Sequence, residues 1–345
     1  MKKLAALFII FVLALFLWIT QNSFVLREQL QNNTAVQRML PTPTPLPFVE
    51  MTIPYLRERE YYSQLYDRQE VADNGTYRSY LTSYESDGFR INGLLTIPTE
   101  KEPNGGWPAI IFIHGYIPPM QYDTLTQYAS YVDYLARQGF VVFKIDLRGH
   151  AQSEGEPGGG YYGSDYIVDT LHAYSALQNS GFVHPKRIGL WGHSMAGNVL
   201  LRSFVVQQDI PAIVIWAGAV YSYEDWQKYG IEDNSYRPLP SGTPRASRRQ
   251  QLFDTYGEFN KDSVFWQQVT PVNYLSGVSG AIQLHHAVDD AVVTVGYSRD
   301  LMNILDATSI THELHEYQSG GHNISGASFE TAMQNTIRFY NQYLK

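Results

Sequence analysis

Residues 188–201 read Ile188-Gly-Leu-Trp-Gly-His-Ser-Met-Ala-Gly-Asn-Val-Leu-Leu201: a short apolar run, small residues around a serine, and the start of an apolar helical pattern. A serine on a sharp turn between a strand and a helix is held exposed for reaction. The turn needs small residues two positions before and after the serine, because strand and helix pass close together there. Gly192 and Ala196 meet this need, so we predict that Ser194 is a nucleophile.

The pattern around Ser194 also has a structural interpretation, a tight packing turn with an incidental serine. The chain contains a second Gly-x-Ser-x-Ala at residues 277–281, where the serine is Ser279. That copy precedes an apolar run instead of following one, so it lacks the strand-to-helix context. Context therefore favours Ser194 over Ser279.

The sequence on both sides of this turn alternates short apolar runs with longer helical patterns. Strands are predicted at 80–84, 89–97, 109–113, 140–145, 188–191, 212–216, 281–285 and 312–317, and helices at 124–137, 165–178, 195–206, 295–305 and 328–344. The first two strands are joined by Asp87-Gly88, a strong hairpin turn signal. The alternation predicts an α/β fold, with a mostly parallel twisted sheet, an N-terminal antiparallel hairpin and helices on both faces. In such sheets the chemistry lies at the carboxyl ends of the strands.

A serine nucleophile needs a base and an acid that orients the base. His322 lies in a Gly-rich loop after the last predicted strand, and we expect it to be the general base. Asp289 follows the 281–285 strand and is the expected acid, with Asp290 as the alternative because a slip of one residue at the strand end would exchange them. The two aspartates could instead only cap a turn. The order Ser, Asp, His at three strand ends favours catalysis.

An oxyanion site is also needed, because the tetrahedral intermediate of acyl transfer carries a negative charge. The strand at 109–113 leads into His114-Gly115-Tyr116. We expect the backbone N–H groups of Tyr116 and Met195 to be the two donors, one from this early loop and one from the residue after the nucleophile.

Composition excludes several other chemistries. The 345 residues contain no cysteine, which removes disulfides, thiolate metal sites and cysteine nucleophiles. The net charge of -8, from 25 Lys+Arg and 33 Asp+Glu, argues against a nucleic-acid partner. His312 and His315 lie on opposite faces of a predicted strand, which argues against a metal pair. We predict no cofactor and a small-molecule ester or peptide substrate.

The N-terminal part of the chain predicts export. Two lysines precede an uninterrupted apolar run from Leu4 to Ile19, and no small-x-small cleavage pattern follows. We expect residues 1–21 to form an uncleaved signal anchor, a transmembrane helix that leaves the catalytic domain outside the cytoplasm. The alternative is a cleaved secretory signal, since the run is short for a bilayer. Residues 22–50 predict a Gln/Asn- and Pro-rich stem.

Residues 51–345 predict one catalytic domain with a lid at about 217–274, a segment long for a strand-to-strand connection. The lid is rich in aromatic residues and arginines. These side chains could cover a cleft and bind substrate, or the aromatics could pack the lid onto the body while the arginines face water. The second interpretation is favoured.

From about Tyr80 to Lys345 the sequence resembles the α/β-hydrolase superfamily. The residues that carry this resemblance are His114-Gly115-Tyr116, Asp146-Leu-Arg148-Gly149-His150, the turn from Gly192 to Gly197, Asp289 and Gly321-His322. The hairpin at 87–95 and the segment at 265–271 are most similar to the catalytic domain of the prolyl-oligopeptidase and acylaminoacyl-peptidase group. The resemblance implies a serine hydrolase that cleaves a peptide (amide) or ester bond through an acyl-enzyme.

Three departures from that group leave alternatives open. Ala151 and Ala196 stand where glycine is usual, and no β-propeller lies between the predicted anchor and the hairpin. Without the propeller the size limit on substrates is absent, so a carboxylesterase or deacetylase of small acyl esters is the first alternative. The second is a catalytically silent binding module that keeps the fold.

Overall fold

The computed structural model describes residues 18–22, 46–158, 160–231 and 244–345. The chain divides into two units, Met1–Pro47 and Phe48–Lys345. Most of the expected anchor (1–21) and stem (22–50) lies outside the described residues. Among the helices in the described ranges, none has both the length and the apolar character needed to cross a membrane. Export of the catalytic domain therefore stays a prediction from the sequence.

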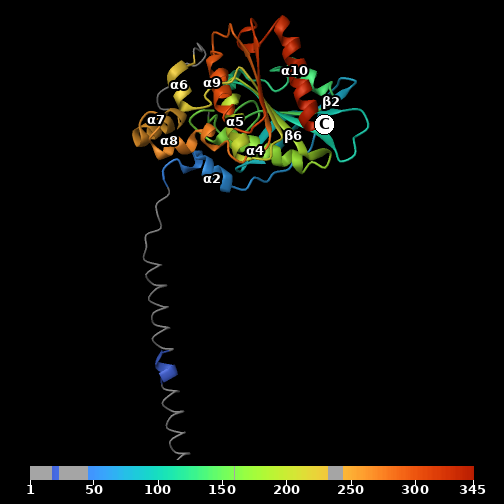
Figure 1. Cartoon of the computed structure of the whole chain (residues 1–345). Helices are drawn as coiled ribbons and strands as arrows, with labels where there is room; N and C mark the ends of the chain where they lie inside the picture. Colours follow the sequence, from blue (N-terminus) through green and yellow to red (C-terminus); the bar gives the residue numbers. More distant parts are fainter. Residues whose placement is uncertain (1–17, 23–45, 159, 232–243) are drawn as a thin grey trace, which may run out of the picture. The chain divides into compact units, whose positions relative to one another are not determined.

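A nine-stranded sheet forms the centre of the described part of the second unit (Figure 1). Its order is β1-β2-β3-β5-β4-β6-β7-β8-β9. The strands are β1 (Gln69–Asp73), β2 (Tyr77–Ser86), β3 (Phe89–Pro98), β4 (Trp107–Ile113), β5 (Val141–Ile145), β6 (Val183–His193), β7 (Ala212–Trp216), β8 (Ala281–Ala287) and β9 (His312–Tyr317). Pairing is antiparallel from β1 through β3 to β5 and parallel from β5 to β9. The predicted mostly parallel sheet with an antiparallel start is confirmed.

Helices cover both faces of this sheet. They are α2 (Ile53–Glu58), α3 (Ala129–Ala136), α4 (Asp165–Gln178), α5 (Ala196–Val206), α6 (Tyr223–Tyr229), α7 (Pro244–Tyr256), α8 (Val264–Val269), α9 (Gly296–Leu305) and α10 (Ala327–Leu344), with 3-10 turns η1 (Val49–Met51), η2 (Pro119–Gln121), η3 (Pro271–Tyr274) and η4 (Gly321–Asn323). Alternate residues of β4 point to opposite faces. Ile110 and Phe112 pack with α3 and α10, and Ile111 and Ile113 pack with α4, α5 and α9. Both faces of the parallel strands are therefore buried.

Several elements differ from the prediction, among them the helices α2, α6, α7 and α8, and two of the differences have a clear physical reason. β1 was not predicted because all five of its side chains are exposed, so it has no alternating apolar pattern. The helix predicted from residue 124 begins at Ala129 instead. Asp123 accepts hydrogen bonds from the amides of Leu125 and Thr126, and Tyr128 has a left-handed φ of 58°. These two features keep residues 124–128 out of the helix.

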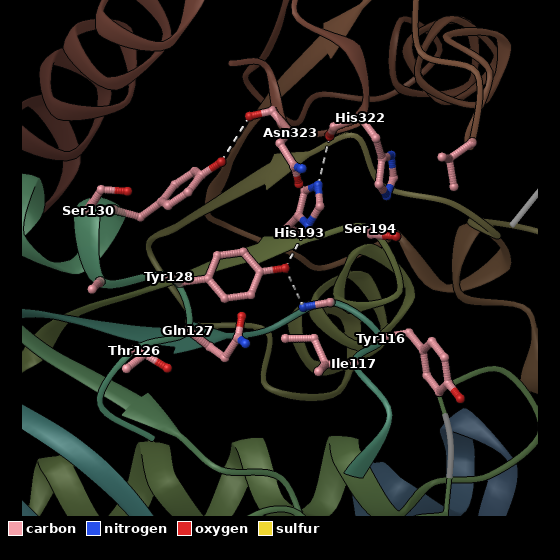
Figure 2. Close-up of a pocket in the computed structure, with 14 residues that line it drawn as sticks. Tyr116, Ile117, Thr126, Gln127, Tyr128, Ser130, His193, Ser194, His322 and Asn323 are labelled. Carbon is pink, nitrogen blue, oxygen red and sulfur yellow. Dashed lines mark hydrogen bonds between the residues drawn. The ribbon is translucent and has the colours of Figure 1, made fainter. Parts of the chain in front are cut away.

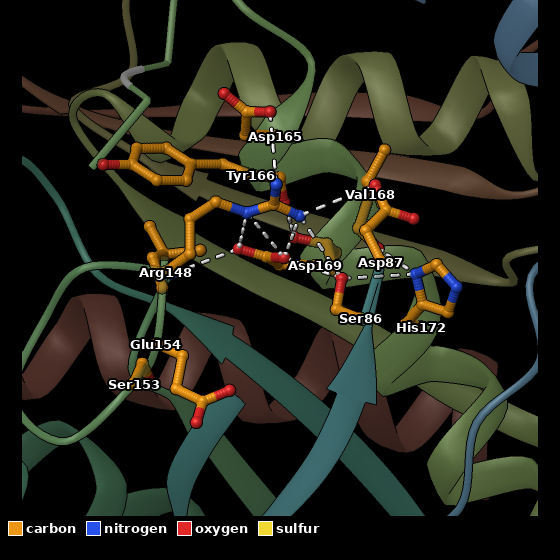
Figure 3. Close-up of polar contacts among 12 residues, drawn as sticks. Ser86, Asp87, Arg148, Ser153, Glu154, Asp165, Tyr166, Val168, Asp169 and His172 are labelled. Carbon is orange, nitrogen blue, oxygen red and sulfur yellow. Dashed lines mark hydrogen bonds and ion pairs between the residues drawn. The ribbon is translucent and has the colours of Figure 1, made fainter. Parts of the chain in front are cut away.

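The loop after β5 is fixed to α4 by a buried ion pair (Figure 3). Nη2 of Arg148 lies 2.6 Å from Oδ1 of Asp169, and Nε lies 3.1 Å from both carboxylate oxygens. The hydroxyl of Ser86, at the end of β2, donates to the same carboxylate at 2.7 Å. Asp165 is an outer partner, 3.2 Å from Nη1. The pair thus joins the hairpin, the β5 loop and α4.

Replacing Asp169 with alanine is expected to lower the free energy of unfolding by about 3 kcal/mol, because it leaves the Arg148 guanidinium buried without its main partner. The matched control is Asp165→Ala, which removes a side chain that is 33% exposed and contacts the same arginine. Its expected cost is below about 1 kcal/mol. Urea unfolding followed by circular dichroism measures both, and equal losses would contradict this account.

Candidate active site

Ser194 lies on the turn between β6 and α5, as the sequence predicts. Its φ of 56° is left-handed, which is uncommon for a residue with a side chain. The Ser194 amide donates to the carbonyl of Trp216 in β7 at 2.9 Å, and the Gly197 amide donates to the Ser194 carbonyl at 2.9 Å. Both backbone polar groups of the serine are thereby held, and its side chain points into a cavity (Figure 2).

The small residues around the turn are required by close packing. A Cβ added to Gly192 would lie 2.7 Å from Cδ1 of Leu200 and 2.8 Å from Cβ of Ala196. Real side chains do not approach so closely, so strand and helix can meet only with glycine at position 192. The methyl group of Ala196 fits because Gly192 opposite it has none.

His322 lies in η4, in the loop that follows β9, and lines the same cavity as Ser194. Its Nδ1 atom is 2.9 Å from Oδ2 of Asp290. An ionised carboxylate only accepts hydrogen bonds, so Nδ1 of His322 carries a proton, and the neutral form of the ring has its lone pair on Nε2. Figure 2 shows the imidazole ring facing Ser194.

Asp289, the acid favoured by the sequence, does not bond to the imidazole of His322. Its carboxylate accepts the amide of Gly321 at 2.9 Å and that of Gly320 at 3.3 Å. β8 continues to Ala287, two residues beyond the predicted strand end, and the Asp290 amide donates to the Ala287 carbonyl. This turn directs Asp290 inward and leaves Asp289 exposed. The structure thus places the alternative, Asp290, beside the imidazole.

The carboxylate of Asp290 is buried but well supplied with donors. Its Oδ1 accepts from the amides of Val292 at 2.8 Å and Val293 at 3.0 Å, and its Oδ2 lies 3.3 Å from Nε2 of His286. Burial alone would raise the pKa of Asp290, but the hydrogen bonds from His286 and His322 hold that pKa well below its usual value. Asp290 is therefore ionised at neutral pH.

The two expected oxyanion donors come from neighbouring elements. β4 pairs with β6 so that Ile113 lies opposite Gly192, which brings the loop after β4 beside the nucleophile turn. Tyr116 lines the cavity with Ser194, and Met195 immediately precedes α5. An amide at the start of a helix is a favourable donor to an anion.

The cavity has a volume of about 690 Å³. Its polar lining includes hydroxyl and amide side chains from the α3 region and the η4 loop: Thr126, Gln127, Tyr128, Ser130, Tyr131 and Asn323. Asp, Glu, Lys and Arg do not occur among its described lining residues. In the described ranges, no group of three or more His, Asp and Glu side chains is placed to hold a metal ion.

The lid residues that the structure describes pack onto the body. Tyr223 of α6 is buried and lies against Trp266 of α8, with ring centroids 4.9 Å apart. Arg249 stacks over the ring of Tyr162, and Arg248 lies 2.5 Å from a carboxylate oxygen of Glu50. These contacts agree with the packing interpretation of the aromatics. Arg248 is exposed, as that interpretation expects, and both arginines also contact protein groups.

Comparisons with known proteins agree with this fold. Residues 108–235 match the Hydrolase_4 family model, described as serine aminopeptidase, S33. An uncharacterized peptidase of Bacillus subtilis (strain 168), YtmA, is 25% identical over 228 residues, which are 64% of this chain and 77% of YtmA.

Solved structures of both peptidases and esterases share the fold. Acetyl xylan esterase 1 from Thermoanaerobacterium sp. JW/SL YS485 superposes with a TM-score of 0.56 at 18% identity, over 86% of this chain and 95% of the esterase. A puromycin-hydrolyzing peptidase of Mycobacterium tuberculosis gives 0.59 at 18% identity, over 79% of this chain but only 40% of that longer protein. The chain therefore has the α/β-hydrolase fold, and it is similar to a serine peptidase family model over residues 108–235 and to proteins named as peptidases and esterases.

Proposed function

We propose that the chain cleaves an acyl bond, a peptide amide or an ester, through an acyl-enzyme on Ser194. The observation that carries this proposal is the His322–Asp290 pair, joined by a hydrogen bond of 2.9 Å, together with the cavity that His322 lines with a serine on a strand-to-helix turn. Acyl transfer by a serine requires a nucleophile, a base that accepts its proton and a carboxylate that orients the base.

The proposed reaction uses residues of this chain alone. Nε2 of His322 takes the hydroxyl proton of Ser194 as Oγ attacks the substrate carbonyl. The amides of Met195 and Tyr116 hold the resulting oxyanion. His322 then gives its proton to the leaving amine or alcohol, and the acyl-enzyme forms. A water that loses a proton to His322 then attacks the acyl carbon. His322 returns that proton to Oγ of Ser194 as the acyl–Oγ bond breaks, which releases the acid and restores the serine. Asp290 keeps the imidazole in the required tautomer throughout.

For the substrate, we propose a peptide, as in a prolyl-oligopeptidase-like serine peptidase. The description of the matching family model and the name of the Bacillus subtilis relative support this choice. The fold comparison supports an esterase as well, since acetyl xylan esterases share it.

One observation favours the second candidate, a carboxylesterase or deacetylase of small acyl esters. The described lining of the cavity offers hydroxyl, amide and aromatic groups but no Asp, Glu, Lys or Arg. Exopeptidases need a charged side chain to bind the terminal ammonium or carboxylate of a peptide, whereas a neutral ester needs none.

A matched substrate panel decides between the two candidates. The panel compares Z-Gly-Pro-p-nitroanilide and alanine p-nitroanilide with p-nitrophenyl acetate and butyrate, with Ser194→Ala as the blank. Because activated esters are intrinsically more reactive, each rate is divided by that of the uncatalysed reaction. We expect the larger rate acceleration for an anilide. Acceleration of the esters alone would replace the peptidase with the esterase.

A further inference from the structure

A chain of hydrogen bonds runs beside the cavity from the loop after β4 to the loop that carries His322 (Figure 2). The amide of Gly115 donates to the hydroxyl of Tyr128 at 3.1 Å. That hydroxyl lies 2.8 Å from Nδ1 of His193, and Nε2 of His193 lies 2.8 Å from the backbone carbonyl of His322. The connection between β4 and α3, the end of β6 and the η4 loop are thus joined through two side chains.

The direction of each bond follows from the groups involved. A carbonyl only accepts, so Nε2 of His193 carries a proton. Burial, aided by the neighbouring His322, lowers the pKa of His193 to about 3, so the ring is neutral and Nδ1 is an acceptor. Tyr128 therefore donates to Nδ1 while it accepts from Gly115. Every link has one donor and one acceptor, and no group in the chain has to change its role.

The backbone of Tyr128 is strained in this arrangement. Tyr128 has a φ of 58° at the start of α3, where no side-chain cap bonds to the helix. A left-handed tyrosine is strained and persists only where its surroundings hold it. The two hydrogen bonds of its hydroxyl are such a restraint. A Cβ on Gly115 would lie 2.9 Å from that hydroxyl and 3.1 Å from Nδ1 of His193. These hydrogen bonds therefore require a glycine at position 115.

We propose that Tyr128 and His193 are positioning residues that align the oxyanion donor and the general base with Ser194. Gly115 directly precedes Tyr116, His193 directly precedes Ser194, and the last acceptor belongs to His322 itself. One end of the hydrogen-bond chain therefore holds the backbone next to the Tyr116 amide, and the other end holds the backbone of His322. The inference rests on the proposed roles of Ser194, His322 and the Tyr116 amide.

Two substitutions break the chain at different links. Tyr128→Phe removes the hydroxyl and leaves the ring, and His193→Leu removes both ring nitrogens. We expect each to lower kcat about tenfold or more, with KM changed less than about threefold, because alignment in the transition state is lost while the cavity is kept. The double variant should show about the same loss of kcat as either single variant, because either substitution already interrupts the same chain of hydrogen bonds.

Controls separate positioning from a structural effect. Tyr134 lies in α3, the helix that Tyr128 precedes, and its hydroxyl bonds to Glu330 at 2.5 Å, away from the cavity. The variant Tyr134→Phe removes only that hydroxyl and should have the kcat of the wild type. His193→Gln keeps an N–H donor that can reach the His322 carbonyl, and should recover part of the activity lost in His193→Leu. All rates are counted per active site by titration with a fluorophosphonate, so that unfolded protein does not contribute.

Two results would overturn the inference: multiplicative losses in the double variant, or an unchanged kcat per titrated site in Tyr128→Phe. Both require an active wild type. A wild type that neither turns over substrate nor reacts with the fluorophosphonate would instead contradict the proposed function itself.

Discussion

Replacing Ser194 with alanine is expected to abolish covalent labelling by a fluorophosphonate probe and to lower kcat at least about 10⁴-fold. The reason is that the hydroxyl oxygen of Ser194 forms the acyl bond in the proposed reaction. Labelling followed by gel fluorescence, and turnover of the best substrate in the panel, measure the two effects.

The chain offers a matched control for this variant. Ser279 sits in the second Gly-x-Ser-x-Ala, precedes β8, and donates its hydroxyl to the Gln208 carbonyl at 3.1 Å. Ser279→Ala should label and turn over like the wild type. Equal labelling of Ser194→Ala and wild type would remove Ser194 from the mechanism. Folded wild type that shows no turnover of any substrate would favour the silent binding module.

Replacing Asp290 with asparagine is expected to lower kcat about 10⁴-fold, because an amide at this position can donate to Nδ1 and so stabilise the wrong imidazole tautomer. The substitution changes one atom, so the packing around it is kept. Initial rates per titrated site give the size of the effect, and circular dichroism verifies the fold.

Asp289→Asn is the matched control for Asp290→Asn. Its amide oxygen can still accept from the Gly321 amide, so the substitution removes only the charge and the longer bond from the Gly320 amide, both on an exposed side chain. We therefore expect kcat to fall less than about tenfold. The reverse pattern, with Asp289→Asn inactive and Asp290→Asn active, would restore the acid that the sequence favours and contradict the assignment made from the structure.

The neighbouring pair Asp289 and Asp290 shows where sequence reasoning stops. An apolar run shows that a strand is present, but its last residue depends on the turn that ends it. β8 runs to Ala287, and a backbone hydrogen bond between Ala287 and Asp290 closes the turn. No side-chain pattern in the sequence signals that bond. Both aspartates follow a strand end, so the sequence alone could not decide which of them bonds to the imidazole of His322.

Other features were predictable because they follow from local patterns. The turn around Ser194 was predicted from small residues between a strand and a helix. The structure explains why they are small, because a Cβ added to Gly192 would lie only 2.7 Å from Cδ1 of Leu200. The sheet was predicted from alternating strand and helix signals. The hydrogen bond between Tyr128 and His193 was not predictable, since the two residues are 65 positions apart and Tyr128 belongs to no local motif. Such a contact exists only once the fold has brought α3 against β6.

The exposed strand β1 has a consequence for how molecules meet. It is the outermost strand on its side of the sheet, where unpaired backbone groups invite strand addition by another chain. Glu70 and Asp73 place negative charges on this edge, and the pairing with β2 shifts register between Glu70 and Ala72. Charge and irregular pairing both disfavour the growth of fibrils from such an edge. The polarity that hid β1 from sequence analysis thus protects the enzyme from aggregation at this edge.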